Sequence, residues 1–131
     1  HYKKDQLFTA GLMLYVAEGD TKECNTIRVS SVRPETHQIF IRFAMEYLGV
    51  DKSKIRLWLI LNSDLTEEVC MKMWRRITTL PFSQFGKTQF VTKTSTRKTL
   101  HYGVGNTIIG NTVLKQKLSR WIELALKDLK N

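Results

Sequence analysis

The pattern of hydrophobic and polar positions predicts that helices and strands alternate along this chain. Residues 5–18 are apolar on nearly every side of a helix, which is typical of a helix buried all round. In residues 26–32 apolar and polar side chains take turns, which indicates a strand with one buried face. A second helix begins at Pro34, the favoured first-turn position for proline, and ends at Gly49. The first half of the chain is therefore predicted to be helix, strand, helix.

The alternation returns in residues 55–62, where leucine and isoleucine fill one face and Arg56 and Trp58 lie on the other. Asp64 and Glu67 have the spacing of a capping box, which predicts a third helix from Leu65 to about Thr78. We expect Trp58, like the other two tryptophans, to belong to the core.

The last third of the chain predicts a β-hairpin followed by a helix. Residues 88–94 and 102–109 have strand character, and the segment between them is polar and basic. Asn111 and Thr112 then begin a helix that extends to about Leu129. Together these elements predict an α+β fold in a single domain, residues 1–131.

The distribution of charge along the chain says more about its function than its length does. The 131 residues carry a net charge of +9, and the chain has no acidic residue between Glu68 and Glu123. A region of one sign is a candidate for binding a phosphate backbone or an acidic surface, and the alternative is a set of solvated lysines. No stretch approaches the apolar length of about 20 residues that a membrane span needs, so we expect no membrane association.

The segment Gly11–Gly19 ends in an acid followed by a glycine. Gly19 is predicted to stop the helix by taking the left-handed backbone conformation. Glu18 is then a carboxylate at the end of a buried helix, which is costly without a partner or a cation. Leu14, together with Ala17, Glu18 and Gly19, resembles the LAGLIDADG motif of homing endonucleases.

The resemblance implies a fold of helix, two strands, helix, two strands, helix. Its mixed or antiparallel curved sheet lies over DNA and has the helices packed on one face. The segment at about residues 64–84 is a helical insertion in that order. Two motif helices pack together in the family, which implies a homodimer. The predicted interface residues are Ala10, Gly11, Leu14 and Ala17. The similarity is closest to bacterial and phage proteins, which implies a cytoplasmic, nucleoid-associated protein.

The resemblance also implies a metal site at the end of the first helix. Glu18 is the predicted catalytic residue, and Glu18 with Asp20 would hold Mg²⁺, which takes few protein ligands. The alternative is a carboxylate held by a neighbouring amide or by Lys22. Catalytic members place a basic residue near the start of the last helix, where the first lysine here is Lys115. Their polar side chain after the second strand is matched by Ser30 or Ser31.

The predicted function is binding of double-stranded DNA through the sheet and the basic hairpin. Two outcomes remain open, which are Mg²⁺-dependent cleavage by a homodimer and binding without cleavage, as in a transcriptional regulator. A module that binds an acidic protein partner is a third class. The predicted DNA-binding residues are Arg28, Ser30, Arg33, Arg56, Lys87, Lys93, Arg97 and Lys98.

Overall fold

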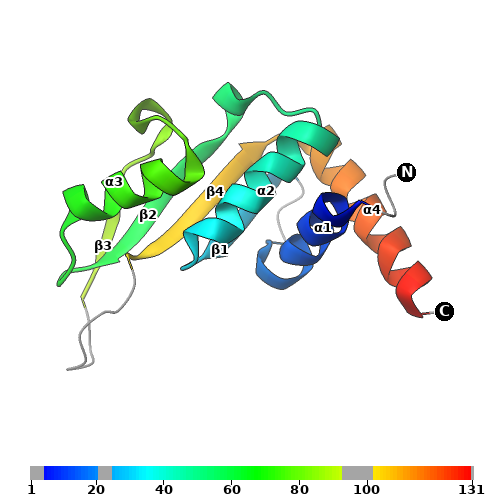
Figure 1. Cartoon of the computed structure of the whole chain (residues 1–131), viewed down its shortest axis with the longest axis horizontal. Coiled ribbons are helices and arrows are strands. Elements are labelled where there is room, and N and C mark those ends of the chain that lie inside the picture. The colour runs from blue at the N-terminus through cyan, green and yellow to red at the C-terminus, as the bar shows by residue number, and fades with distance from the viewer. Residues whose placement is uncertain (1–4, 21–24, 93–101, 131) are drawn as a thin grey trace.

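The structure, a computed structural model, describes residues 5–20, 25–92 and 102–130 (Figure 1). The described part is an α+β fold with four α-helices and a four-stranded mixed sheet. In chain order the elements are α1 (Gln6–Glu18), β1 (Thr26–Ser31), α2 (Pro34–Tyr47), a 3₁₀ turn (Lys52–Lys54), β2 (Arg56–Asn62), α3 (Glu67–Thr78), a 3₁₀ turn (Phe82–Gln84), β3 (Gln89–Val91), β4 (Val104–Gly110) and α4 (Thr112–Lys130).

The strand order corrects the predicted hairpin. The sheet runs β1-β4-β2-β3, with β4 antiparallel to both β1 and β2, and β3 parallel to β2. The strands predicted at 88–94 and 102–109 are therefore not neighbours, because β2 lies between them. Alternation of side chains within a strand defines its two faces but not its neighbour in the sheet. A short connection between two strand-like segments therefore does not show that they pair.

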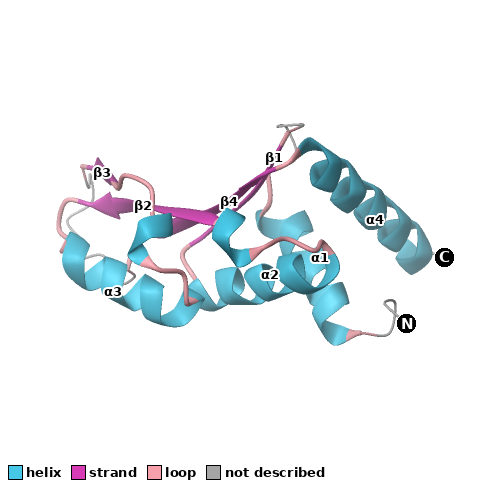
Figure 2. Cartoon of the chain, turned by 90° about the horizontal axis from the view of Figure 1, so that it is seen from above, coloured by secondary structure: helices cyan, strands magenta, loops and turns pink. Residues whose placement is uncertain are grey.

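One face of the sheet forms the core. Ile27 and Val29 of β1 and the three leucines of β2 point inward and are at most 1% exposed. In Figure 2 the helices α1, α2 and α3 all lie on one side of the sheet, while α4 extends away from its end. The other side of the sheet carries no described helix, and this asymmetry positions the candidate site.

Within a single chain the first helix is buried on one side only. Gly11 faces inward, where a Cβ atom would lie 2.2 Å from the Phe43 ring of α2. The opposite side of α1 faces solvent, with Val16 44% exposed and with Ala17 and Glu18 also exposed. The close approach that Gly11 permits is therefore made within this chain, and Gly11 is not available to a partner.

The two predicted helix caps have different outcomes. The predicted cap of the last helix is confirmed, because Asn111 Oδ1 accepts a hydrogen bond of 3.0 Å from the Leu114 amide. The capping box of the third helix is wrong. Thr66, not Asp64, precedes the first helical residue, and its side chain makes no capping hydrogen bond. The predicted helical segment at 64–84 is nevertheless present as α3 and the following 3₁₀ turn.

Candidate nucleic-acid interface

We call the uncovered side of β1, β4 and β2 the open face. Inward and outward residues alternate in each strand, and the pairing register aligns the outward positions across the sheet. No described helix lies over this side (Figure 2). The outward residues are Thr26, Arg28, Ser30, Arg56, Trp58, Ile60, Asn62, Val104, Asn106 and Ile108.

Two arginines share one row of the open face. Arg28 and Arg56 both pair with Ile108, one from each side, so their strands are two spacings or about 10 Å apart. The Arg28 guanidinium donates to a carboxylate oxygen of Asp20 at 2.8 Å. The Arg56 guanidinium donates to the Ser53 carbonyl at 2.8 Å, and its side chain stays exposed. The row therefore holds two arginines separated by an apolar side chain, and the charge of Arg28 is balanced by Asp20.

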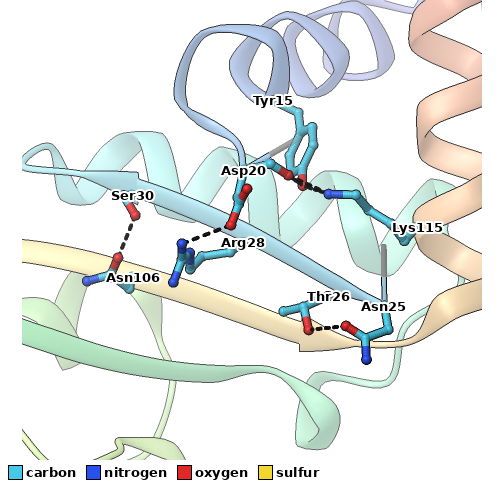
Figure 3. Close-up of polar contacts among 8 residues, drawn as sticks. All are labelled: Tyr15, Asp20, Asn25, Thr26, Arg28, Ser30, Asn106 and Lys115. Atoms are coloured by element: carbon cyan, nitrogen blue, oxygen red, sulfur yellow. Dashed lines mark hydrogen bonds and ion pairs between the residues drawn. The ribbon is translucent and has the colours of Figure 1, made fainter. Parts of the chain in front are cut away.

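The next row places polar side chains at the centre of the sheet. Ser30 and Trp58 flank Asn106 in the register, and the Ser30 hydroxyl donates to Asn106 Oδ1 (Figure 3). Asn106 is only 3% exposed, and its Nδ2 has no hydrogen-bond partner among the described residues. A buried amide nitrogen without an acceptor is uncommon and costs stability.

The sequence did not predict two residues of this row. Asn106 was missed, and Trp58 was assigned to the core. Trp58 is half-buried on the open face, so its predicted place in the core is wrong. The signal for Asn106 was available, because an amide interrupts an otherwise apolar and small strand, Val104–Gly110. This signal could be interpreted only from the strand register, which places Asn106 beside Ser30.

The remaining predicted DNA-binding residues are spread around the sheet. Arg33 lies beyond the end of β1, at the residue before α2, and is exposed. Lys87 is exposed next to the short edge strand β3, after Gly86, whose amide donates to the Leu57 carbonyl at 2.7 Å. Lys93, Arg97 and Lys98 lie outside the described residues. The structure therefore brings Arg28, Ser30 and Arg56 together and leaves Arg33 and Lys87 off the open face.

The end of α1 differs from its prediction in two ways. Gly19 has φ −90° and ψ 157°, which is extended and not left-handed, and it forms a β-bridge with Val29. Glycine is required there by close contact instead, since a Cβ atom would lie 2.5 Å from the Tyr15 ring and carbonyl. Glu18 is exposed, so it is not the buried carboxylate that the apolar run suggested.

A buried lysine reaches this turn from the last helix. Lys115, in the first part of α4, is 4% exposed and donates to the Tyr15 hydroxyl and to the Asp20 carbonyl (Figure 3). Its ammonium also lies 4.9 Å from the centre of the Tyr15 ring. The last helix therefore brings a cation to the residues that follow Glu18, although the two segments are far apart in sequence.

The described residues of one chain do not form a complete metal site. The described residues contain no cluster of three or more histidine, cysteine, aspartate or glutamate side chains. The Asp20 carboxylate already accepts the Arg28 guanidinium, and the Lys115 ammonium lies at its backbone carbonyl. One cation at the carboxylate and a second at the carbonyl of the same residue disfavour a divalent cation there, so Asp20 together with the other described residues of one chain does not fit Mg²⁺.

Comparisons with family models, curated proteins and solved structures returned no match. The described helices include none with the length and hydrophobicity that crossing a membrane requires.

Proposed function

We propose that this chain binds double-stranded DNA on its open face. The observation that carries the proposal is a sheet covered by helices on one side and lined on the other by Arg28, Arg56 and the polar row of Ser30 and Asn106. The net charge of +9 gives the protein the sign that attracts phosphates from a distance.

The two rows of the open face suit different parts of a duplex. Arginine guanidiniums bind phosphates and fix the register of a protein on DNA without reading sequence. Hydroxyl and amide groups can exchange hydrogen bonds with base edges, and strands lie within the major groove, which is about 12 Å wide. The row of Arg28 and Arg56 therefore supplies affinity, and Ser30 of the neighbouring row, which is partly exposed, faces the bases.

The test is a titration of a labelled duplex at several salt concentrations, with fluorescence anisotropy as the measurement. Arg56→Ala should weaken binding several-fold and lower the slope of log affinity against log salt by about 0.9, the value for one lost phosphate contact. Arg120→Ala is the matched control, because Arg120 is also exposed but lies on α4. Equal losses for both variants, or affinity independent of salt, would overturn the proposal.

Pairing of two copies is proposed through the solvent side of α1. Ala17 is exposed, and Ala10 and Leu14 are partly exposed, so the three predicted interface residues leave some apolar surface facing water. Ala17→Glu should abolish any dimer detected by sedimentation and leave the helical circular dichroism signal unchanged. A wild-type protein that stays monomeric at high concentration and on DNA would exclude this part of the proposal.

Cleavage is proposed only for such a pair, because the described residues of one chain do not bring together the carboxylates that would hold Mg²⁺. Pairing through α1 would bring together two copies of the exposed Glu18, and in each copy the Lys115 amine donates to the carbonyl of Asp20, two residues further on. Duplex cleavage that requires Mg²⁺ and is lost in Glu18→Gln would establish the nuclease. If wild type and Glu18→Gln bind the duplex equally well and neither cleaves it, the alternative, a non-catalytic regulator, is favoured.

A further inference from the structure

The solvent side of α3 carries a second basic surface, which the open face does not include. A hollow of about 410 Å³ near the end of the helix is lined by Lys72, Arg75, Arg76, Thr79 and Pro81. Lys52 extends the positive charge at its edge by donating to the Thr79 hydroxyl at 2.8 Å. Three cations around one concave surface favour a carboxylate or another anionic group.

An adjoining hollow has a different chemistry. Its volume is about 310 Å³, and it is lined by Val69, Lys72, Met73, Arg76 and Tyr102. Val69 is 55% exposed and Tyr102 is 48% exposed, so apolar area faces water here. Lys72 and Arg76 line both hollows, so the two hollows form one continuous surface with a basic half that suits an anion and an apolar half.

The fold uses little of this charge. Lys72 lies 3.2 Å from Glu68 in an exposed pair, which contributes little to stability. The Arg75 guanidinium lies 4.9 Å from the centre of the Phe82 ring. Arginine in the last turn complements the helix dipole, which accounts for part of the basic character but not for the apolar side chains next to it.

We propose that these two hollows bind an acidic segment of a partner protein, with a carboxylate in the basic hollow and an apolar side chain in the other. A phosphate backbone offers nothing for Val69, Met73 and Tyr102 to cover, whereas an acidic peptide with apolar residues matches both halves. In Figure 2 α3 lies on the helix side of the sheet, so a duplex on the open face leaves this surface accessible. The proposal does not depend on DNA binding.

The probe is a short labelled peptide of aspartate and glutamate with interspersed leucine and phenylalanine, followed by fluorescence anisotropy. A second peptide keeps every acid and replaces the apolar residues with serine. Arg76→Glu should weaken binding of the first peptide about tenfold or more, because a repulsive charge replaces an attractive one in both hollows. Val69→Ser should weaken it about threefold, and Arg120→Glu on α4 should leave it unchanged.

The same titration separates this surface from the DNA-binding face. Arg56→Ala should not alter peptide affinity, and an unlabelled duplex should not displace the peptide from wild-type protein. Arg76→Gln, which keeps a polar side chain at an exposed position, repeats the test if Arg76→Glu shows an altered circular dichroism spectrum. Equal binding of the serine peptide, displacement by the duplex, or insensitivity to both Arg76 variants would overturn the proposal.

Discussion

The two faces of the central strand β4 differ more than any other neighbouring regions of the molecule. Its inward residues are closely packed, with Gly105 against Trp74 and Thr107 bonded to His37. Its outward residue Asn106 keeps a buried amide nitrogen without a partner in the described structure. Residues one position apart thus have different environments, because the inward set packs in the core while the outward amide nitrogen contributes no hydrogen bond within the described structure.

The largest expected effect is on the inward face. In Gly105→Ala the new Cβ would lie 2.4 Å from the Trp74 ring, so the strand or the indole must move. We expect the free energy of unfolding to fall by about 3 kcal/mol, the upper part of the range for overpacked cores. Gly110→Ala is the control in the same strand, because nothing lies within 4 Å of its Cβ position. Urea denaturation measures both, and similar losses would refute the packing argument.

The next effect is a dependence of stability on pH that originates at His37. Burial lowers the pKa of His37 to about 4, although the hydrogen bond to Ser31 opposes the shift. The ring is neutral when folded, with Nε2 donating to the Ser31 carbonyl at 3.1 Å and Nδ1 accepting from the Thr107 hydroxyl at 2.7 Å. The unfolded chain takes up a proton near pH 6.5, so stability is lost as pH falls below that value and towards 4.

Between pH 7.5 and 4.5 this group should remove about 2 kcal/mol from the free energy of unfolding. Carboxylates also titrate in that range, so the informative quantity is the difference between wild type and His37→Gln, which has no ionisable group at this position. Urea midpoints at the two pH values provide the comparison. An identical pH dependence in both proteins would show that His37 is not buried in its neutral form.

A smaller effect compares neighbouring residues directly. Thr107→Val removes the hydroxyl that donates to His37 and should cost about 1 kcal/mol, because the ring nitrogen stays buried without a partner. Asn106→Leu on the other face removes an unsatisfied amide and should change the free energy of unfolding by less than about 0.5 kcal/mol. Reversal of this order would mean that the outward row, not the inward one, stabilises the sheet.

Much of the fold could be predicted because it is encoded locally. Alternation identified β1 and β2 and their outward residues, and Pro34 marked the start of α2. The neighbours of β3 and β4 could not be predicted, since pairing depends on contacts between distant segments. The conformation of Gly19 was misjudged because the Tyr15 ring, not the backbone angle, requires a glycine there.

The residues of the candidate site could be predicted where they lie on strands. Alternation alone placed Arg28, Ser30 and Arg56 on one face, as the register confirms. Lys115 could not be placed at the end of α1, because its contact with Tyr15 joins residues 100 positions apart. Side chains that reach across the molecule become visible only once the helices are packed.

The smallest expected effect tests whether the ion pair between Arg28 and Asp20 limits the affinity of the open face for DNA. Arg28 is 41% exposed while its partner Asp20 is 15% exposed, so Asp20→Asn should cost less than about 1 kcal/mol of stability. The freed guanidinium should then raise duplex affinity about threefold and steepen the salt slope by up to about 0.9. Measurements in EDTA exclude any contribution from a bound cation.

Glu123→Gln is the matched control for that measurement, because it frees Arg120 from a comparable exposed pair on α4, where the two atoms are 3.9 Å apart. Both substitutions add one unit to the net charge, so a general electrostatic effect would raise affinity equally. A gain confined to Asp20→Asn would locate the phosphate contact at Arg28, on the open face. Equal gains would mean that the charge of the whole molecule, and not the outward side of the sheet, determines affinity for DNA.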